Sequence, residues 1–430
     1  MKFFDTFRGR VTMTLSARGV AVGVALVSSV ITSRWLGPEG RGVLVTLSVI
    51  TGIALQFGNM GLHSGNVYFA AREPDARGRI LGNTLWLSIA LGLATGFLAL
   101  GVAAARPDWV AGIPMALILV TVAALPFQFM IFFFQNTLLG MDEVKAFNLF
   151  EIGQRVLAFL LVAVYLTVLA GGAAGTVVLL SIVGVLGGIG SAVYCRLRVP
   201  FVWGFDRQLF LRMIRYGGKV YLACLFSFMV IRSDLLLVNY YLGTASAGVY
   251  SIAAQIADVL LLVPVTVGMI LLPRIAAAGT EDPEAVTARV TRHAALIMSV
   301  LCIVAFVLVG PVVRLLYGQP FEGAIEPTRW LLAGVWAIGL NGILMNHFAG
   351  KGLPWGIVAI PLAGLALNVG LNVTLIPSFG LVGAAAASTA AYMLMFGLAL
   401  TWFVRSGSAG LRDTILIPAD EIAGLFESRI

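Results

Sequence analysis

Charged side chains interrupt two neighbouring apolar segments of this chain. Arg232 and Asp234 lie within one segment, and Asp258 lies within the next. An Arg or Asp near the middle of a bilayer costs about 2.5–3.5 kcal/mol on insertion scales, so such groups must pair or line a water-filled cavity. A buried arginine can hold an anion through two parallel hydrogen bonds, and a buried carboxylate can carry a proton or Na⁺. These three residues are the first candidates for chemistry.

Sequence spacing decides which of the charged groups can meet. Arg232 and Asp234 are two residues apart and point to different sides of one helix, so we expect at least one of them to reach another helix or a cavity. Arg18 lies about 10 Å into the first apolar segment, where it either lines a cavity or extends its side chain to the inner interface. Glu151 and Arg155 are four residues apart, which favours an ion pair along one helix face.

Polar side chains form stripes at helical spacing on three helix faces, one of which includes Asp258. These stripes are Ser251, Gln255, Asp258 and Thr266; Gln56, Asn59, His63 and Asn66; and the weaker set Thr121, Gln128 and Gln135. Polar stripes on apolar helices face protein or water rather than lipid. Hydrogen bonds between helices explain any single Asn or Gln, whereas Arg232 and Asp258 favour a cavity.

The sequence offers no grouping that supports catalysis or metal binding. His63 and His347 lack metal-ligand partners at suitable spacing, and Cys195, Cys224 and Cys302 are isolated. The glycine-rich runs lack the lysine and the spacing of a phosphate-binding loop. We therefore expect no metal, no cofactor, no direct use of ATP and no enzymatic activity.

The elements that position these side chains are apolar helices in lipid. Of the 430 residues, 60% are hydrophobic and only 11% are charged, whereas soluble domains carry about 25% charged residues. A span needs about 20 apolar residues, and the apolar runs are continuous rather than alternating, which favours helices over a barrel. The fold class is therefore an all-α integral membrane protein with about twelve transmembrane helices. The predicted spans are Val11–Trp35, Gly42–Ala70, Ile80–Ala105, Ile113–Leu139, Val144–Leu169, Ala173–Cys195, Tyr216–Tyr241, Gly248–Leu272, His293–Tyr317, Thr328–Ala349, Trp355–Ile376 and Leu381–Val404.

Lysine and arginine are distributed unevenly between the two sides of these spans. Most of the basic residues fall on the side that holds the amino terminus, in a pattern typical of cytoplasmic loops. We expect both termini in the cytoplasm, a location in the cytoplasmic (inner) membrane, and no cleavable signal peptide, because the first apolar run is of span length. The net charge of +8 then follows from topology, and no nucleic-acid partner is expected.

The chain divides into two halves. Leu36–Val43 and Leu242–Val249 both read L-G-x-x-x-x-G-V, at corresponding places after the first and seventh spans. Two six-helix lobes of the same orientation imply a pseudo-two-fold axis along the membrane normal. The basic, aromatic segment Arg196–Lys219 separates them, and we expect it to lie on the anionic inner leaflet. The predicted divisions are an amino-terminal lobe over 1–198, a basic cytoplasmic linker over 199–219, a carboxy-terminal lobe over 220–405 and a cytoplasmic tail over 406–430.

Several short motifs resemble those of one family of membrane proteins. The motifs are Arg34–Gly42, Gly61-Leu62, Arg232-Ser233-Asp234, Leu242-Gly243, Gly248–Ser251, Ala253-Ala254, Leu272-Pro273, Asn368, Asn372, Ile376-Pro377 and Gly380–Ala385. In order and spacing they resemble bacterial polysaccharide transporters of the multidrug/oligosaccharidyl-lipid/polysaccharide exporter superfamily. The resemblance touches most of the chain and is consistent with twelve spans. The lipid II flippases of that superfamily usually have fourteen.

The resemblance implies a flippase for undecaprenyl-diphosphate-linked oligosaccharide, in which two lobes enclose a cationic cavity and open alternately to each side. Arg232, Arg18 and Arg155 are then candidates for the diphosphate. Polar cavity or coupling residues would be Asp234, Asp258, Gln255, Gln56, Asn59, His63 and Gln128. The implied partners are the lipid-linked oligosaccharide, membrane lipids and, as candidates, polysaccharide assembly proteins.

Two other functions and three energy sources stay open from the sequence. A drug or organic-cation antiporter of the same superfamily would need an acidic cavity, yet the spans hold similar numbers of acids and arginines. A membrane-embedded polysaccharide polymerase or ligase would need a large outer loop, which the spacing of the spans leaves no room for. A proton gradient, a Na⁺ gradient or the membrane potential could each drive transport.

Overall fold

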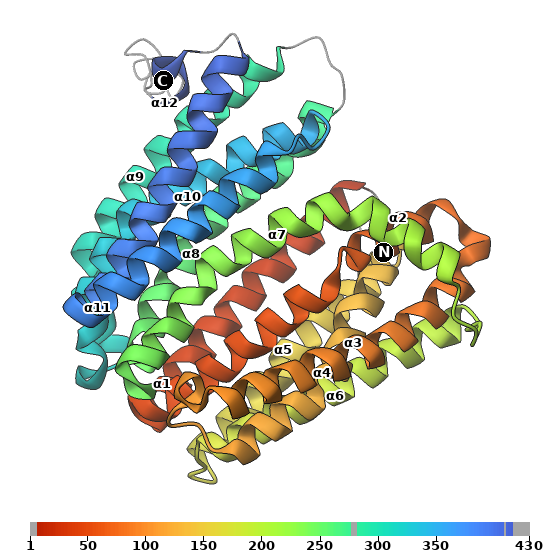
Figure 1. Ribbon diagram of the computed structural model, residues 1–430, viewed down its shortest axis with the longest axis horizontal. Coiled ribbons are helices and arrows are strands. Elements are labelled where there is room, and N and C mark those ends of the chain that lie inside the picture. The colour runs from red at the N-terminus through yellow and green to blue at the C-terminus, as the bar shows by residue number, and fades with distance from the viewer. Residues whose placement is uncertain (1–6, 277–281, 408–409, 416–430) are drawn as a thin grey trace. The chain divides into compact units, whose positions relative to one another are not determined.

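The computed structural model describes residues 7–276, 282–407 and 410–415, and the described part of the chain is helical with no strand (Figure 1). Side chains are described from residue 19 onward, apart from those of 273, 274 and 276. The helices are α1 (Phe7–Asn59), α2 (Leu62–Arg72), α3 (Arg77–Ala105), α4 (Met115–Gly140), α5 (Val144–Thr167), α6 (Ala173–Arg198), α7 (Arg207–Leu242), α8 (Thr244–Ala276), α9 (Pro283–Leu316), α10 (Ile325–Gly350), α11 (Gly356–Ser406) and α12 (Leu411–Ile415).

The number of membrane-spanning segments agrees with the sequence-based expectation. Ten stretches of helix within the described ranges are long and apolar enough to cross a membrane. Two of them, in α1 and α11, are each a pair of helices joined at a kink, at Gly37 (φ 66°) and Gly380 (φ 59°). Each double helix contains two predicted spans, because a glycine with positive φ turns the chain sharply between them. The prediction of about twelve spans is confirmed.

The second predicted span, Gly42–Ala70, is not one continuous helix. Helix α1 ends at Asn59 and α2 begins at Leu62. The two intervening residues both have positive φ, 49° at Met60 and 81° at Gly61, so the helix cannot run through them. The break places Asn59 at the last turn of α1 and His63 in the first turn of α2.

Contacts divide the chain into two compact units. The first unit holds residues 1–225 together with 243–248, and the second holds 226–242 and 249–430. Residues 207–219, which the sequence analysis placed in a linker, form the first turns of α7. The segment between α6 and α7 that is not helical therefore covers only 199–206.

In the first unit, α4 packs against α2, α3 and α6. Its buried face presents Phe129, Phe133 and Phe134 to the unit's core. Close packing is possible because small residues on the neighbouring helices face this helix: a Cβ on Gly92 would overlap the backbone of Pro126. Small residues at helix contacts are the usual means of tight packing where lipid supplies no hydrophobic drive.

In the second unit, α10 packs between α9 and α11 (Figure 1). It is buried on most sides, including at Leu340, Ile343 and Leu344. The short helix α12 packs on α9. The second unit is thus organised around one central helix, with α7 and α8 contributing the charged residues described below.

The segment 199–206 is held on the surface of α3. The indole of Trp86 donates to the Trp203 carbonyl over 2.8 Å, and the Asn83 side chain bonds both the amide and the carbonyl of Asp206 over 2.8 Å. These contacts fix the start of α7. That the segment also lies on the inner leaflet stays a prediction.

Asp206 caps the first turn of α7. Its carboxylate accepts a hydrogen bond from the Leu209 amide over 3.0 Å. It also forms an ion pair with the Arg79 guanidinium over 2.9 Å. The Leu209 amide, and after it the Arg79 guanidinium, hold the pKa of the Asp206 carboxyl below its ordinary value. Since the folded-state pKa is the lower one, this contribution to stability is present above the ordinary aspartate pKa and is lost as the pH falls through the folded-state value.

The two copies of the repeated motif pack against each other reciprocally. A Cβ on Gly42, the seventh residue of the first copy, would overlap the carbonyl of Thr244, the third residue of the second. A Cβ on Gly248, the seventh residue of the second copy, would overlap the carbonyl of Pro38, the third residue of the first. The Thr244 hydroxyl also donates to the Ala111 carbonyl over 2.9 Å. The motif is therefore a paired backbone contact in which no side chain larger than hydrogen fits.

Candidate functional site

An ion pair joins the predicted charged residues of α7 and α8. A guanidinium nitrogen of Arg232 lies 2.8 Å from a carboxylate oxygen of Asp258. The two side chains are 27% and 40% exposed, so the pair is not sealed within the helix packing. Pairing removes most of the cost of placing two charges in a span, and the remaining exposure lets an external group reach the guanidinium. Arg232 thus reaches a second helix, one of the arrangements that its spacing from Asp234 favoured.

Asp234 is buried in a cage of neutral donors. It is 3% exposed, and one carboxylate oxygen accepts from the Tyr250 hydroxyl over 2.8 Å and from the Ser388 hydroxyl over 3.1 Å. The other oxygen accepts from the Leu235 amide over 2.7 Å. Every donor that the described residues place on this carboxylate is neutral, so no side-chain cation contacts its charge directly.

Two buried asparagines of α11 extend this cage. The amide nitrogen of Asn368 donates to Ser388 over 3.1 Å, and its amide oxygen accepts from Ser233 over 3.2 Å and from Asn372 over 3.0 Å. The amide oxygen of Asn372 is buried and has no hydrogen-bond donor among the described residues. An unsatisfied buried oxygen is costly, and this one belongs to a network that also contains a carboxylate.

The sequence analysis did not assign Tyr250, Ser388, Asn368 or Asn372 to the site. The two asparagines are four residues apart on an otherwise apolar helix, and by the rule applied to the other polar stripes this spacing could have identified them. A single serine or tyrosine within an apolar run carries no such signal, because either residue is common at helix contacts.

The polar stripe of Gln56, Asn59, His63 and Asn66 lies in the first unit, and its members make two kinds of contact. The Asn59 amide oxygen contacts the ring Nδ1 of His63 at 2.9 Å, and the buried amide nitrogen of Asn59 has no acceptor in the part of the chain that is described. Gln56, one turn earlier, is half-buried. Asn66, by contrast, is buried and donates to the Thr84 hydroxyl and the Phe133 carbonyl, which is interhelical bonding.

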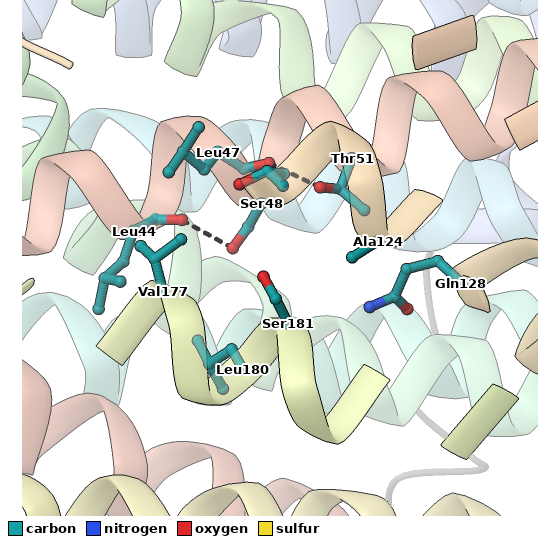
Figure 2. A pocket seen from close by; sticks show the side chains of 10 residues that line it. Leu44, Leu47, Ser48, Thr51, Ala124, Gln128, Val177, Leu180 and Ser181 are labelled. Carbon is teal, nitrogen blue, oxygen red and sulfur yellow. Dashed lines mark hydrogen bonds between the residues drawn. The ribbon is translucent and has the colours of Figure 1, made fainter. Parts of the chain in front are cut away.

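Gln128 lines a cavity of about 180 Å³ between α1, α4 and α6. Figure 2 shows Ser48 of α1 above Ser181 of α6, with Thr51 and Gln128 to one side. The polar groups of this lining are hydroxyls and one amide, and apolar side chains such as Leu47 complete it. Such a surface can hydrogen-bond an uncharged hydroxylated group but offers no charge to an ion.

The remaining predicted residues are Arg155, Gln255 and Arg18. Arg155 pairs with Glu151 along α5 at 3.4 Å and is 51% exposed, as their spacing favoured. Gln255 is half-buried on α8, one turn before Asp258. Arg18 lies in α1, but its side chain falls outside the described residues. In the described part of the chain no three His, Cys, Asp or Glu side chains form a group that could hold a metal.

The fold and the polar groups within its spans define a multi-span helical transporter. A family model described as polysaccharide biosynthesis protein matches residues 31–326. The chain belongs to this family, and the resemblance stated from its motifs is confirmed.

Two curated relatives match parts of the chain. The probable flippase AglR of Haloferax volcanii is 26% identical over 162 residues, which are 36% of this chain and 34% of that protein. The uncharacterized membrane protein MJ1068 of Methanocaldococcus jannaschii is 23% identical over 205 residues, which are 46% of this chain and 40% of that protein. The matches thus span well under half of either relative.

Solved structures with the same fold belong to the superfamily that the sequence motifs resemble. An inward closed conformation of the lipid II flippase MurJ superposes with a TM-score of 0.75 at 12% identity, covering 94% of this chain and 89% of that one. An inward-facing multidrug resistance MATE family transporter of the MOP superfamily superposes with a TM-score of 0.73 at 15% identity, covering 90% and 96%. At these identities the likeness establishes the fold.

Proposed function

We propose that the protein translocates an undecaprenyl-diphosphate-linked oligosaccharide across the cytoplasmic membrane by alternating access. The observation that carries the proposal is Arg232, a cation within a membrane span that is paired with Asp258 and still partly exposed. In the absence of substrate, the ion pair with Asp258 lowers the cost of placing the Arg232 guanidinium within a span. An arriving diphosphate can then replace Asp258 as the partner of the guanidinium. Arginine suits this exchange because its planar donors match two phosphate oxygens at once.

The rest of the substrate has matching surfaces in the chain. Sugar hydroxyls need neutral donors and acceptors, and the cavity beside Gln128 supplies hydroxyl and amide groups without charge. The apolar tail needs no protein enclosure, because it can stay in the bilayer while the headgroup crosses. The family and the flippase name of a relative support the same class of substrate.

Purified full-length protein in liposomes tests the proposal directly. With a lipid-linked oligosaccharide in the bilayer, we expect protein-dependent exposure of the glycan to a lectin on the opposite side, and no efflux of a fluorescent organic cation. Cation efflux coupled to proton or Na⁺ entry, without glycan movement, would instead support the antiporter. A change in glycan chain length would support a polymerase or ligase.

The Asp234 cage is the proposed coupling site. One buried carboxylate with neutral hydroxyl and amide oxygens balances a single positive charge, so the cage suits a proton or one Na⁺. Binding would neutralise the Asp234 carboxylate, and the connected network of Asn368 and Asn372 holds one amide oxygen, that of Asn372, with no donor within the described residues. Loss of the bound proton or Na⁺ would leave the Asp234 carboxylate charged within the span. The occupancy of the cage and the conformation of the protein are therefore linked.

We expect Asp234→Asn to remove the dependence of transport on an ion gradient. The amide keeps the shape of the side chain but cannot take up a positive charge, so gradient-driven glycan accumulation should fall at least about tenfold. Transport is measured in proteoliposomes under a Na⁺ gradient, a pH gradient or neither. Thr374→Ala is the matched control, because Thr374 lies on α11 and bonds only its own helix. Undiminished gradient-driven transport by Asp234→Asn would remove the cage from the coupling mechanism.

A further inference from the structure

A second pocket lies along α2, beside the first turns of α7. It is an open pocket of about 600 Å³, lined chiefly by His63, Ser64, Val67, Tyr68, Arg72 and Tyr216. Ser64, Tyr68 and Arg72 are spaced by four residues and therefore share one face of α2. Tyr216 comes from the first turns of α7. The positive-inside pattern predicts that Arg72 is on the inner side of the membrane.

Helix packing explains why Tyr216 stands beside α2. Gly217, the next residue, meets the backbone of Gly61 so closely that a Cβ on either glycine would overlap the other. This contact fixes the first turns of α7 against the start of α2. As a result, the rings of Tyr216 and Tyr68 stack with centroids 4.1 Å apart and an interplanar angle of 22°.

Arg72 brings an uncompensated positive charge to this pocket. One guanidinium nitrogen donates to the Tyr68 hydroxyl over 2.7 Å, and the guanidinium lies 5.7 Å from the centre of that ring. It makes no ion pair with any acid in the described ranges. The neighbouring Arg212 differs, because it is paired with Glu73. The remaining donors of Arg72 are available to an anion.

The pocket also contains aromatic and hydroxyl groups, which can contact a sugar and which a site for an anion alone would lack. Tyr216 is 49% exposed, so it keeps open ring surface although it stacks on Tyr68. An exposed aromatic surface next to polar groups suits the apolar face of a sugar ring. The Ser64 hydroxyl lies 3.0 Å from the ring Nε2 of His63, and both groups are able to contact sugar hydroxyls. A stack that served only to join α2 to α7 would not require an arginine without an acidic partner.

We propose that this pocket binds a glycosyl phosphate, with the phosphate on Arg72 and the sugar on Tyr216. Within the proposed function, on which this inference rests, the pocket receives the headgroup of the lipid-linked substrate at the inner face before translocation. A bulk phospholipid could supply the phosphate but not the sugar ring. Recognition of both parts together is therefore the distinguishing property of the pocket.

The test measures binding to the purified full chain in nanodiscs of neutral phosphatidylcholine. The probes are N-acetylglucosamine 1-phosphate, inorganic phosphate and free N-acetylglucosamine, each followed by titration calorimetry. We expect the sugar phosphate to bind more tightly than either separate part. Arg72→Gln should weaken it about tenfold or more, since a charge-assisted contact is lost. Tyr216→Leu should also weaken it, whereas Tyr216→Phe, which keeps the ring, should not.

The control variant is Arg106→Gln, which removes an exposed arginine on the predicted outer side. It should bind the sugar phosphate as the wild type does. Equal binding by Arg72→Gln and wild type would overturn the proposal, as would equal affinity for inorganic phosphate and the sugar phosphate. Loss of wild-type binding in nanodiscs containing phosphatidylglycerol would identify a phospholipid as the occupant and would also overturn it.

Translocation measured on the same variants separates this inference from the proposed function. If the wild type translocates lipid-linked oligosaccharide but does not bind the sugar phosphate through Arg72, the flippase function stands and the pocket assignment fails. If the sugar phosphate binds through Arg72 and no translocation occurs, the pocket stands as a glycosyl phosphate site and the flippase function fails.

Discussion

Replacing Arg232 with alanine is expected to abolish glycan export while the protein still inserts in the membrane. The variant loses the proposed partner of the diphosphate and leaves Asp258 without its cation. A fall in transport of at least about a hundredfold, equivalent to about 2.7 kcal/mol of transition-state stabilisation, is expected. The measurement is glycan exposure in proteoliposomes, with insertion and amount checked by membrane fractionation.

The partner Asp258 provides the control that distinguishes substrate binding from structural pairing. Arg232→Ala combined with Asp258→Ala restores charge balance and should restore the stability of the protein, but not transport. The exchanged pair, Arg232→Asp with Asp258→Arg, rebuilds the ion pair with its cation on α8. If the pair is only structural, this exchange should recover export. Full export by Arg232→Ala, or by the double alanine variant, would show that the guanidinium does not bind the substrate.

Replacing Gly42 with alanine is expected to prevent normal folding. The added Cβ would overlap the Thr244 carbonyl, and a backbone carbonyl cannot move aside by changing a rotamer. Inserting atoms into close-packed sites costs about 1–3 kcal/mol and occasionally more, and here the overlap is with the main chain of another helix. We expect a loss of monodisperse protein in detergent and a clear fall in thermal midpoint, measured by fluorescence-detected size exclusion after heating.

Gly248→Ala should behave like Gly42→Ala, because Gly248 faces the Pro38 carbonyl in the reciprocal contact. The matched control is Gly101→Ala in α3, where no atom of the described residues would lie within 4 Å of the new Cβ. In a helix, this control should be neutral or stabilise by up to about 1 kcal/mol. A thermal midpoint for Gly42→Ala equal to that of Gly101→Ala would show that the motif contact adjusts easily and contributes little.

The membrane fold could be predicted from the sequence because lipid constrains it strongly. Length and continuous apolar character determine a span, and both are visible without any neighbour. The break at Met60 and Gly61 was not visible, because it depends on two backbone angles within an otherwise uniform apolar run. The kinks at Gly37 and Gly380 are similar: the sequence indicated the ends of spans there, but not the positive φ at each glycine that joins two helices at a sharp angle.

The candidate site could be predicted only in part. Arg232 and Asp234 were found because charge within a span is rare, and their spacing excluded a pair between them. That Asp258 is the partner of Arg232 depends on the crossing of α7 and α8, which the sequence does not contain. Ser388 could not be found, since one hydroxyl in an alanine-rich run has an ordinary explanation. Ser388 is recognised only through its hydrogen bond to Asp234, a residue far away in the sequence.

Residues 243–248 pack with the first unit, although the chain on both sides of them belongs to the second. The helices of the first unit are synthesised in order. Thr244 and Gly248, which contact Gly42 and Pro38, are synthesised some two hundred residues later. The nascent first unit must therefore persist in the membrane with this contact open until α8 begins to emerge from the ribosome. If the gene were divided between α6 and α7, this contact would form only when the two separate polypeptides associate in the membrane.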